Sequence, residues 1–312
     1  MVVVALVALY LVWGSTYLAM RVAIEGLPPL GMAGVRYVLA GLILLAVVRW
    51  RKVAMPTKRE WALSVPLGAL LFLVGNGLVV LAERTLDSSI AAVVCATTPL
   101  IAAAIGAGMG ERPSRPEVIG TMLGLGGVAV LALGSPLASS GASGLVILLA
   151  PVGWAIGSMI AKKTKATGMG AAAAQMISGG AWMLLASALK GESMPHEVTA
   201  RVAFAWVWLV IFGSLVGFTA YVFLLGRTRP AVAMSYAYVN PIVAVLLGGF
   251  LGGEHIGLST LFATALIAAG VMCAVMLRAR ARGLRVEPSP CSKSTSRPGT
   301  SLRTSSSSAR SA

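Results

Sequence analysis

Three polar side chains that could bind a solute lie next to a proline inside an apolar stretch. Residues 235–254 are apolar enough to lie in a bilayer, and just before Pro241 come Tyr236, Tyr238 and Asn240. A proline inside a helix removes one backbone donor and crowds the carbonyl oxygen four residues earlier. In hydrocarbon such a defect persists only where protein or a wet cavity covers it. We therefore predict a helix break at Pro241 beside a pocket.

A similar stretch occurs at residues 97–111, where Pro99 lies 142 residues before Pro241. Matching broken helices in the two halves of a membrane protein point to a central substrate site. Pro99 and Pro241 are therefore the predicted helix-breaking or gating positions. Glu111 and Glu254 each follow the glycine-rich end of one stretch. We expect them to end helices and pack turns, with proton coupling as the alternative.

Asn76 is a polar residue well inside another apolar segment, between Gly75 and Gly77. A carboxamide in lipid is costly unless it finds a hydrogen-bond partner. Close approach of backbone at the glycines would satisfy it structurally. The alternative is a polar contact in the pocket, with the glycines leaving room for a solute.

Arg36 is the basic residue that falls within a predicted span, towards its outer end. An intramembrane arginine needs a partner or water and marks a functional site by default. The alternative is that its side chain extends to the outer interface. The candidate counter-charges are Glu25, Glu83 and Asp87. A guanidinium at the mouth of a pocket could also attract a substrate carboxylate.

Other aromatic or polar residues within the apolar segments are weaker candidates, because many such residues form interfacial belts or core. Trp13, Tyr17, Trp154 and Gln175 belong to this group. The complete predicted substrate pocket comprises Trp13, Tyr17, Arg36, Asn76, Trp154, Gln175, Tyr236, Tyr238 and Asn240.

No catalytic or metal-binding pattern is visible, so we predict neither an enzyme nor a bound cofactor. The two histidines, His196 and His255, have no second ligand nearby, and the sequence has no GxxxxGK[ST] or GxSxG motif. Its three cysteines fit neither a disulfide framework nor a metal site. The net charge of +15 lies mostly in short loops and in the tail. A basic groove with interleaved aromatic residues is absent, which argues against nucleic acid.

The composition indicates a membrane protein, with 57% hydrophobic residues, 11% charged residues and a mean hydropathy of +0.87. Charged residues make up about a quarter of a soluble domain. The apolar residues form blocks of about 20, the length that crosses a bilayer. We predict ten spans: 2–20, 29–48, 61–82, 88–108, 117–134, 144–161, 169–189, 204–225, 231–251 and 257–277.

The distribution of lysine and arginine predicts the orientation. With the N-terminus inside, 20 of these 25 residues fall on the cytoplasmic side and four outside. Without the C-terminal tail the ratio is still 12 to 4. Because cytoplasmic loops carry an excess of positive charge, both termini are predicted to lie in the cytoplasm.

The internal similarity divides the chain into two halves and a tail. Residues 1–134 and 144–277 would each hold five spans, and an odd number of spans gives the halves opposite polarity, an inverted repeat. Residues 278–312 form a basic, Ser-rich tract that we expect to be disordered and cytoplasmic. The predicted fold is an all-α, multi-pass membrane protein.

Five short stretches match one known pattern: WGSTYLAMR at Trp13, PPLGMAGVR ending at Arg36, GNG at Gly75, IAAVVCATTPL at Ile90 and SYAYVNPIVAVLLGGFLGGE at Ser235. In these stretches the chain resembles the EamA-type proteins of the drug/metabolite transporter superfamily. The resemblance covers about residues 8–277. It implies ten helices in two inverted EamA repeats, a bacterial inner membrane, and export of small metabolites, amino acids or drugs by alternating access.

The leading hypothesis is therefore a secondary exporter of small amphipathic molecules, with the lipid bilayer as its surroundings. One alternative is a channel or facilitator, which would need a continuous polar stripe along several helices. Another is a membrane scaffold for a partner protein. The substrate, the coupling ion and the oligomeric state do not follow from the sequence.

Overall fold

The computed structural model describes residues 1–108, 115–133, 145–193, 197–228, 233 and 236–283, and every regular element among them is a helix. A helix suits apolar segments because it satisfies its own backbone hydrogen bonds without water. Seven segments are long and apolar enough to cross a membrane: Val2–Ala23, Pro29–Trp50, Lys58–Ala82, Ser88–Gly108, Val146–Lys163, Met169–Leu189 and Ala200–Arg227.

The elements follow one another along the chain as α1 (Val2–Ala23), α2 (Pro29–Trp50), α3 (Lys58–Gly68), η1 (Ala69–Gly77), α4 (Leu78–Ala82), α5 (Ser88–Cys95), α6 (Thr98–Gly108), α7 (Arg115–Leu133), η2 (Val146–Leu149), α10 (Ala150–Lys163), α11 (Met169–Leu189), α12 (Ala200–Trp208), η3 (Leu209–Phe218), α13 (Thr219–Arg227), α15 (Tyr236–Phe250) and α16 (Leu258–Gly283). The all-helical fold is confirmed. Helices α7, α15 and α16 contain shorter apolar stretches, so the number of ten spans stays a prediction. Most of the expected disordered tail, residues 284–312, lies outside the described residues.

Two long helix pairs connect the halves of the chain, α2 with α11 and α7 with α16. Both pairs are antiparallel. A Cβ at Gly34 would lie 3.0 Å from the carbonyl oxygen of Gly180, and one at Gly41 would lie 3.0 Å from that of Ala173. Higher residue numbers in α2 therefore lie against lower residue numbers in α11. Small residues at these contacts let the helix backbones approach closely.

The second pair follows the same geometry. Gly127 of α7 lies against Ala263 and Ile267 of α16, whereas Gly270 of α16 lies against Gly120 and Gly124 of α7. Helices at corresponding positions in the two halves thus run in opposite directions where they meet.

A π-helical segment occurs at the corresponding place in each half. The segments are η1 and η3, and each continues directly from an α-helix into another α-helix. A π-helical turn is rare, and it occurs frequently at functional sites. Both segments contribute residues to the cavity described below.

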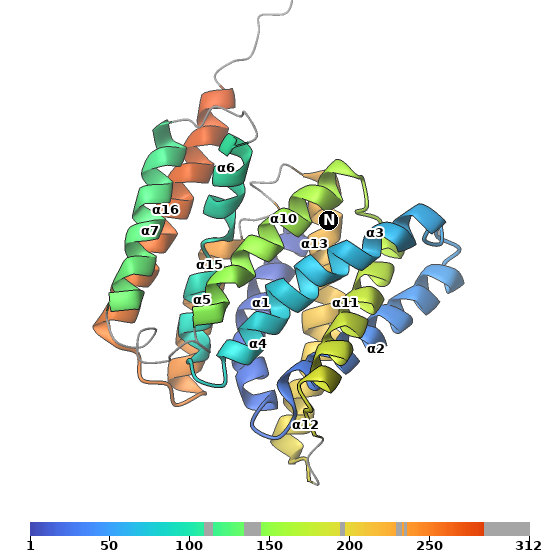
Figure 1. Ribbon diagram of the computed structural model, residues 1–312. Helices are drawn as coiled ribbons and strands as arrows, with labels where there is room; N and C mark the ends of the chain where they lie inside the picture. The colour runs from blue at the N-terminus through green and yellow to red at the C-terminus, as the bar shows by residue number, and fades with distance from the viewer. Residues whose placement is uncertain (109–114, 134–144, 194–196, 229–232, 234–235, 284–312) are drawn as a thin grey trace, which may run out of the picture.

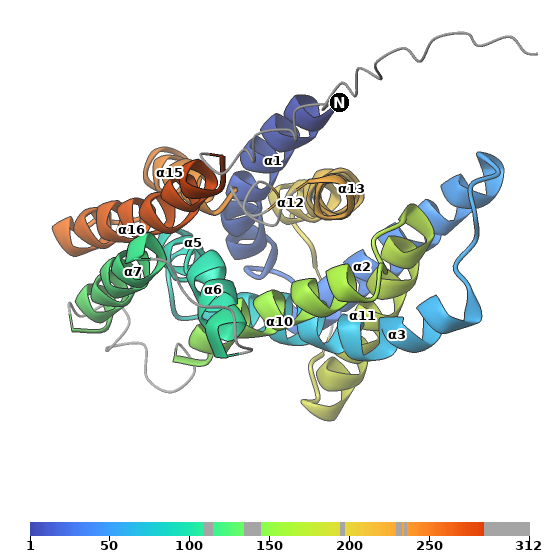
Figure 2. The ribbon, with the colours of Figure 1, turned by 90° about the horizontal axis from the view of Figure 1, so that it is seen from above.

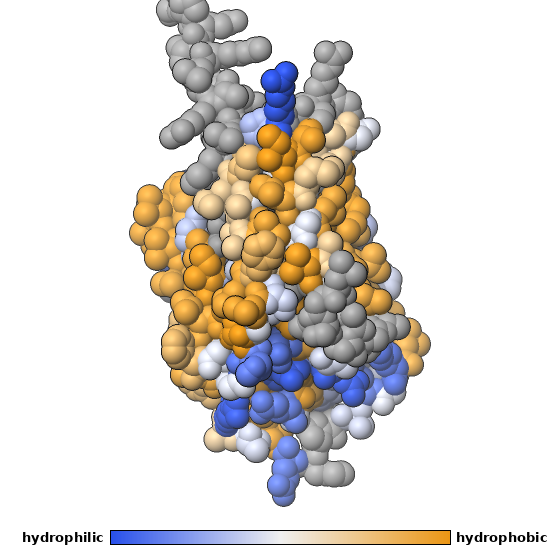
Figure 3. Space-filling model, turned by 90° about the vertical axis from the view of Figure 1, so that its left-hand side faces the viewer, coloured by the Kyte–Doolittle hydropathy of each residue, from blue (hydrophilic) through white to orange (hydrophobic). Residues whose placement is uncertain are grey.

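Helix α1 lies between two groups of helices, as the view from above shows (Figure 2). Helices α5, α6, α7, α15 and α16 lie on one side of it, and α12 and α13 on the other; Figure 1 shows the same grouping from the side. The face of α7 and α16 is mainly apolar, with hydrophilic residues gathered towards its lower end (Figure 3). A bundle with such an apolar face suits a lipid environment.

The two prolines behave differently. The helix predicted at 88–108 is interrupted before Pro99, where α5 ends and α6 begins. Pro99 cannot donate to the carbonyl oxygen of Cys95, and the hydroxyl of Thr98 donates to that oxygen instead, at 2.7 Å. Helix α15, in contrast, continues through Pro241. The break expected at Pro241 is therefore not seen.

Candidate functional site

A cavity lies where α1, α2, η1, α10, η3 and α15 come together, with contributions from α4, α5 and α6. Its empty space is about 640 Å³, including its open side. The lining residues are Trp13, Thr16, Tyr17, Met20, Arg36, Tyr37, Phe72, Gly75, Asn76, Val79, Cys95, Thr98, Ala150, Pro151, Trp154, Gly213, Phe218, Tyr236 and Asn240. Residues from both halves of the chain therefore share one space.

Aromatic rings form much of the wall, and Trp13 lies at their centre. Its ring meets Trp154 at 5.4 Å and Tyr236 at 4.9 Å between centroids, both edge to face. The indole nitrogen of Trp13 donates to the carbonyl oxygen of Gly213 at 3.1 Å. Farther along the wall, Phe72 meets Phe218 at 4.9 Å. These rings give the cavity a large apolar surface.

Arg36 brings a buried positive charge to this aromatic wall. The residue is 3% exposed, so it does not extend to the interface. Its Nε donates to the hydroxyl of Ser214 at 2.8 Å, and its guanidinium carbon lies 4.4 Å from the centre of the Tyr37 ring. A Cβ at Gly213 would be 3.2 Å from Nη2, so the glycine makes room for the guanidinium. Nη1 has no acceptor among the described residues.

Asn76 also presents an unpartnered polar atom to the cavity. Its Oδ1 is buried and accepts no hydrogen bond from the described residues. The close backbone approach considered as a structural alternative therefore does not satisfy this oxygen. Trp154 Nε1 likewise lacks a described partner with hydrogen-bond geometry. Buried polar groups are normally hydrogen-bonded. Asn76 Oδ1, Trp154 Nε1 and Arg36 Nη1 are therefore three buried polar atoms, on residues that line the same cavity, that a bound ligand could complete.

Asn240 connects α15 to α1 at the cavity wall. With its amide nitrogen assigned by the surrounding acceptors, it donates to the carbonyl oxygens of Tyr236 at 3.2 Å and Tyr10 at 3.3 Å. Pro241 follows it in a buried position. Both predicted prolines are thus next in sequence to a lining residue, Asn240 or Thr98.

The structure brings seven of the nine predicted pocket residues together: Trp13, Tyr17, Arg36, Asn76, Trp154, Tyr236 and Asn240. Gln175 lies elsewhere, because it is buried in α11 and its amide donates to the carbonyl oxygen of Ala166 at 2.9 Å. The side chain of Tyr238 lies outside the described residues. Sequence reasoning missed the apolar wall, Phe72 and Phe218, for which only the nearby glycines gave a signal.

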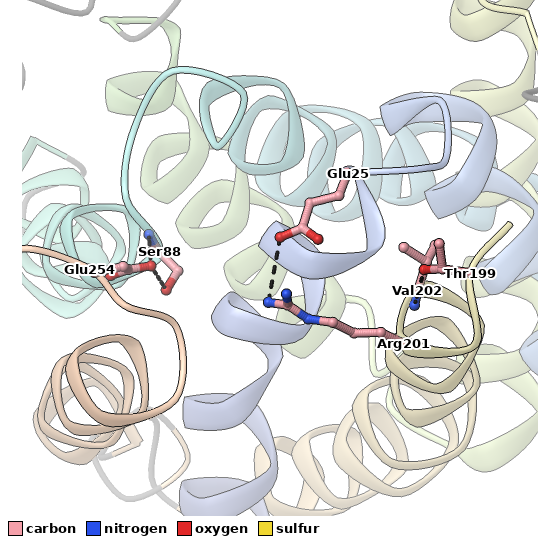
Figure 4. A network of polar contacts seen from close by, with 6 residues as sticks. All are labelled: Glu25, Ser88, Thr199, Arg201, Val202 and Glu254. Carbon is pink, nitrogen blue, oxygen red and sulfur yellow. Dashed lines mark hydrogen bonds and ion pairs between the residues drawn. The ribbon is translucent and has the colours of Figure 1, made fainter.

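Charged groups gather near the ends of α1, α4, α5 and α15. Glu254 caps the N-terminus of α5. Its carboxylate accepts from the backbone nitrogen of Ser88 at 2.8 Å (Figure 4) and from that of Ser89 at 3.1 Å. Glu254 therefore makes a structural contact at the start of a helix, whereas the sequence predicted a role in ending one; Glu111 lies outside the described residues. Glu25 pairs with Arg201 at 3.6 Å (Figure 4), rather than with Arg36.

Two carboxyl groups near these helix ends have shifted pKa values. Burial raises the pKa of Glu83 well above its ordinary value; the charge of Glu254 raises it further, and Arg21 and Arg36 lower it. The pKa of Asp87 is raised by burial and by Glu254, against the opposing effect of Arg21. In the described part of the chain no three His, Cys, Asp or Glu side chains form a group that could hold a metal ion.

The EamA-like transporter family model matches residues 1–133 and again residues 142–276. The chain is 40% identical over 252 residues to the "Uncharacterized inner membrane transporter YedA" of Escherichia coli K12, covering 80% of this chain and 82% of YedA. It is 26% identical over 291 residues, 91% of this chain and 96% of the relative, to the "Probable terminal-alkyne amino-acid exporter" of Streptantibioticus cattleyicolor.

A third relative is the "Probable amino-acid metabolite efflux pump" of Salmonella typhimurium, 24% identical over 275 residues and covering 83% of this chain and 90% of the pump. A known crystal structure shares the fold, with a TM-score of 0.65 at 21% identity over 88% of this chain and 98% of the other. Two family matches that together cover most of the chain identify it: the protein belongs to the EamA-like transporter family.

Proposed function

We propose that this protein is a secondary transporter that exports small amphipathic metabolites, amino acids or drugs across the bacterial inner membrane by alternating access. The observation that carries the proposal is the free Nη1 of Arg36, which lies inside an aromatic cavity shared by both halves. A buried N–H donor without an acceptor is costly, and a bound ligand that accepts its hydrogen bond would remove this cost. The cavity is the proposed substrate site.

The chemistry of the wall supports a carboxylate as the polar part of the substrate. A guanidinium forms strong, directional hydrogen bonds to carboxylates. The rings of Trp13, Trp154 and Phe218 offer an apolar surface to the rest of the molecule. The unpaired oxygen of Asn76 suits a donor such as an amide or ammonium group. The printed names of two relatives, both concerned with amino-acid export, agree with this class.

The proposed topology has ten spans in two inverted halves, residues 1–134 and 144–277, with both termini in the cytoplasm. The antiparallel contacts of α2 with α11 and of α7 with α16 support opposite polarity of the halves. The excess of basic residues in the predicted cytoplasmic segments supports the orientation. The glycine contacts form smooth faces on which one helix group can rock against the other.

Transport into proteoliposomes tests this function. We expect saturable uptake of at least one amphipathic carboxylate from a metabolite panel, reduced tenfold or more in Arg36→Gln because the anion loses its charged partner. Arg201→Gln, which changes an exposed arginine outside the cavity, serves as the matched control and should transport normally. Flux that rises with concentration without saturating would favour a channel. The absence of transport of every panel compound would contradict the proposal and favour a scaffold.

A further inference from the structure

Glu83 carries a carboxyl group that the protein buries without a hydrogen-bond donor. It directly follows α4, one helical turn after Val79 of the cavity wall. The residue is 0% exposed, and neither carboxylate oxygen has a donor among the described residues. Its backbone carbonyl accepts a hydrogen bond from Arg21 Nη1, and its backbone nitrogen donates to the carbonyl oxygen of Val79 at 2.9 Å. An ionised carboxylate in such surroundings is costly, and a buried carboxyl group usually avoids this cost by taking up a proton.

The groups that face Glu83 come from several elements packed around it. Arg21 and Tyr17 lie on α1, Arg36 on α2 and Cys95 on α5, and Glu254 follows α15. None of them forms an ion pair with Glu83, because Arg201–Glu25 is the one ion pair in the described part of the chain. Their influence on Glu83 therefore acts through space.

Exposure separates Arg36 and Glu83 from the other charges. Arg21, Asp87 and Glu254 are partly exposed, so water can compensate their charges. Glu254 is in addition held by the backbone nitrogens of Ser88 (Figure 4) and Ser89 at the start of α5. Arg36 and Glu83 are 3% and 0% exposed, so water compensates neither charge; the positive charges that act on Glu83 are Arg21 and, less strongly, Arg36.

A bound carboxylate changes this balance. At a pH above the raised pKa of Glu83, its ionised carboxylate and the positive charge of Arg36 sum to zero in the empty cavity. A carboxylate on Arg36 adds a second negative charge near Glu83, and the two anions repel each other in a poorly screened interior. One proton on Glu83 restores neutrality. By linkage, the proton then strengthens binding of the anion as much as the anion strengthens binding of the proton.

We propose that Glu83 is the proton-binding site of the transport cycle, and that it binds one proton together with each carboxylate that Arg36 holds. This inference rests on the proposed function, with Arg36 as the carboxylate anchor. The proton passes from water to a carboxylate oxygen of Glu83 and returns to water when the substrate leaves. No covalent bond in the substrate changes. The loaded and the empty cavity are then both neutral, and carboxylate and proton move together without net charge.

Binding calorimetry on the full chain in detergent tests the inference. The probe is N-acetyl-phenylalanine, an aromatic monocarboxylate, and its neutral amide is the matched ligand. Titrations in buffers with different ionisation enthalpies count the protons taken up on binding. For the wild type we expect proton uptake that depends on pH and, at its maximum between about pH 5 and pH 9, approaches one proton per bound anion. Where uptake is at this maximum, the affinity for the anion should fall by up to tenfold for each unit that the pH rises.

Two variants separate the contributions. Glu83→Gln, which imitates the protonated form, should bind the anion with pH-independent affinity and take up no proton. Asp87→Asn, which changes a partly exposed acid nearby, should keep the wild-type uptake. Anion binding with no proton uptake by the wild type at any pH in this range would overturn the inference, as would full uptake in Glu83→Gln. Failure of the wild type to bind the anion, or unchanged binding in Arg36→Gln, would instead contradict the carboxylate site itself.

Discussion

The indole rings of Trp13 and Trp154 meet edge to face across the cavity, with centroids 5.4 Å apart and ring planes at 82°. Trp13 lies on α1 and Trp154 on α10, and these helices fall in different EamA matches. The contact therefore joins the two halves of the protein at the proposed substrate site. Any rocking of one half against the other has to alter it.

Replacing Trp13 by alanine should lower both stability and ligand binding. The change removes ring contacts with Trp154, Tyr221 and Tyr236, each worth about 0.5–1.5 kcal/mol. We expect a lower thermal unfolding midpoint and at least a tenfold weaker binding of an aromatic carboxylate. Trp50→Ala, at a site that is 79% exposed, is the control. Equal effects of the two substitutions would show that the aromatic wall has no special role.

Gly180→Ala should weaken the contact between α11 and α2. The added Cβ would lie 2.7 Å from the carbonyl oxygen of Gly34 and 2.7 Å from the backbone nitrogen of Val38. Backbone atoms cannot move aside easily, so we expect a loss of about 1–3 kcal/mol, measured by thermal unfolding. Gly126→Ala in α7, where the added Cβ meets no atom within 4 Å, should be neutral or stabilising. A stable Gly180→Ala protein would contradict the close packing of this pair.

Thr98→Val should destabilise the break between α5 and α6. The Thr98 hydroxyl donates to the carbonyl oxygen of Cys95. The backbone of Pro99 cannot do so, because proline has no N–H group. Leaving this oxygen without a partner costs about 1–3 kcal/mol. Thr98→Ser keeps the donor and should keep most of the stability. Hydrogen exchange of the backbone amides at the start of α6 would localise the effect. Equal protection of these amides in Thr98→Val and Thr98→Ser would contradict a stabilising role of the hydroxyl.

The raised pKa of Glu83 predicts how stability depends on pH. The folded protein holds this proton at higher pH than the unfolded chain does. The free energy of unfolding should therefore fall as pH rises from the ordinary glutamic acid range, about 4.3, through the raised pKa. Thermal unfolding across this range should show a smaller decline for Glu83→Gln. The exposed control Glu197→Gln should follow the wild type, and a decline in Glu83→Gln as steep as the wild-type one would contradict the assignment.

Much of the cavity could be predicted from the sequence, because polar and aromatic residues inside apolar segments are few and need a common location. That reasoning located Trp13, Arg36 and Asn240 correctly at the cavity wall. It failed for Gln175, whose amide finds a backbone carbonyl nearby. A polar residue in a span can be satisfied locally, and only tertiary contacts distinguish the two cases.

The burial of Glu83 could not be predicted for a related reason. The sequence places it beside Arg84, at the end of an apolar segment, where a charged residue normally reaches water. Its burial results from packing by elements distant in sequence. The two prolines also have equivalent positions in the sequence but different surroundings: the helix ends before Pro99 and continues through Pro241.

The most direct test of the central claim, alternating access through the cavity, is counterflow in proteoliposomes. Vesicles that contain the full-length protein are preloaded with an unlabelled amphipathic carboxylate, and entry of the labelled compound is followed. A carrier predicts that preloading accelerates labelled entry in the wild type and in Arg201→Gln, and that Arg36→Gln loses this acceleration. Labelled entry that is unaffected by preloading, or that is equally fast in Arg36→Gln, would contradict the account.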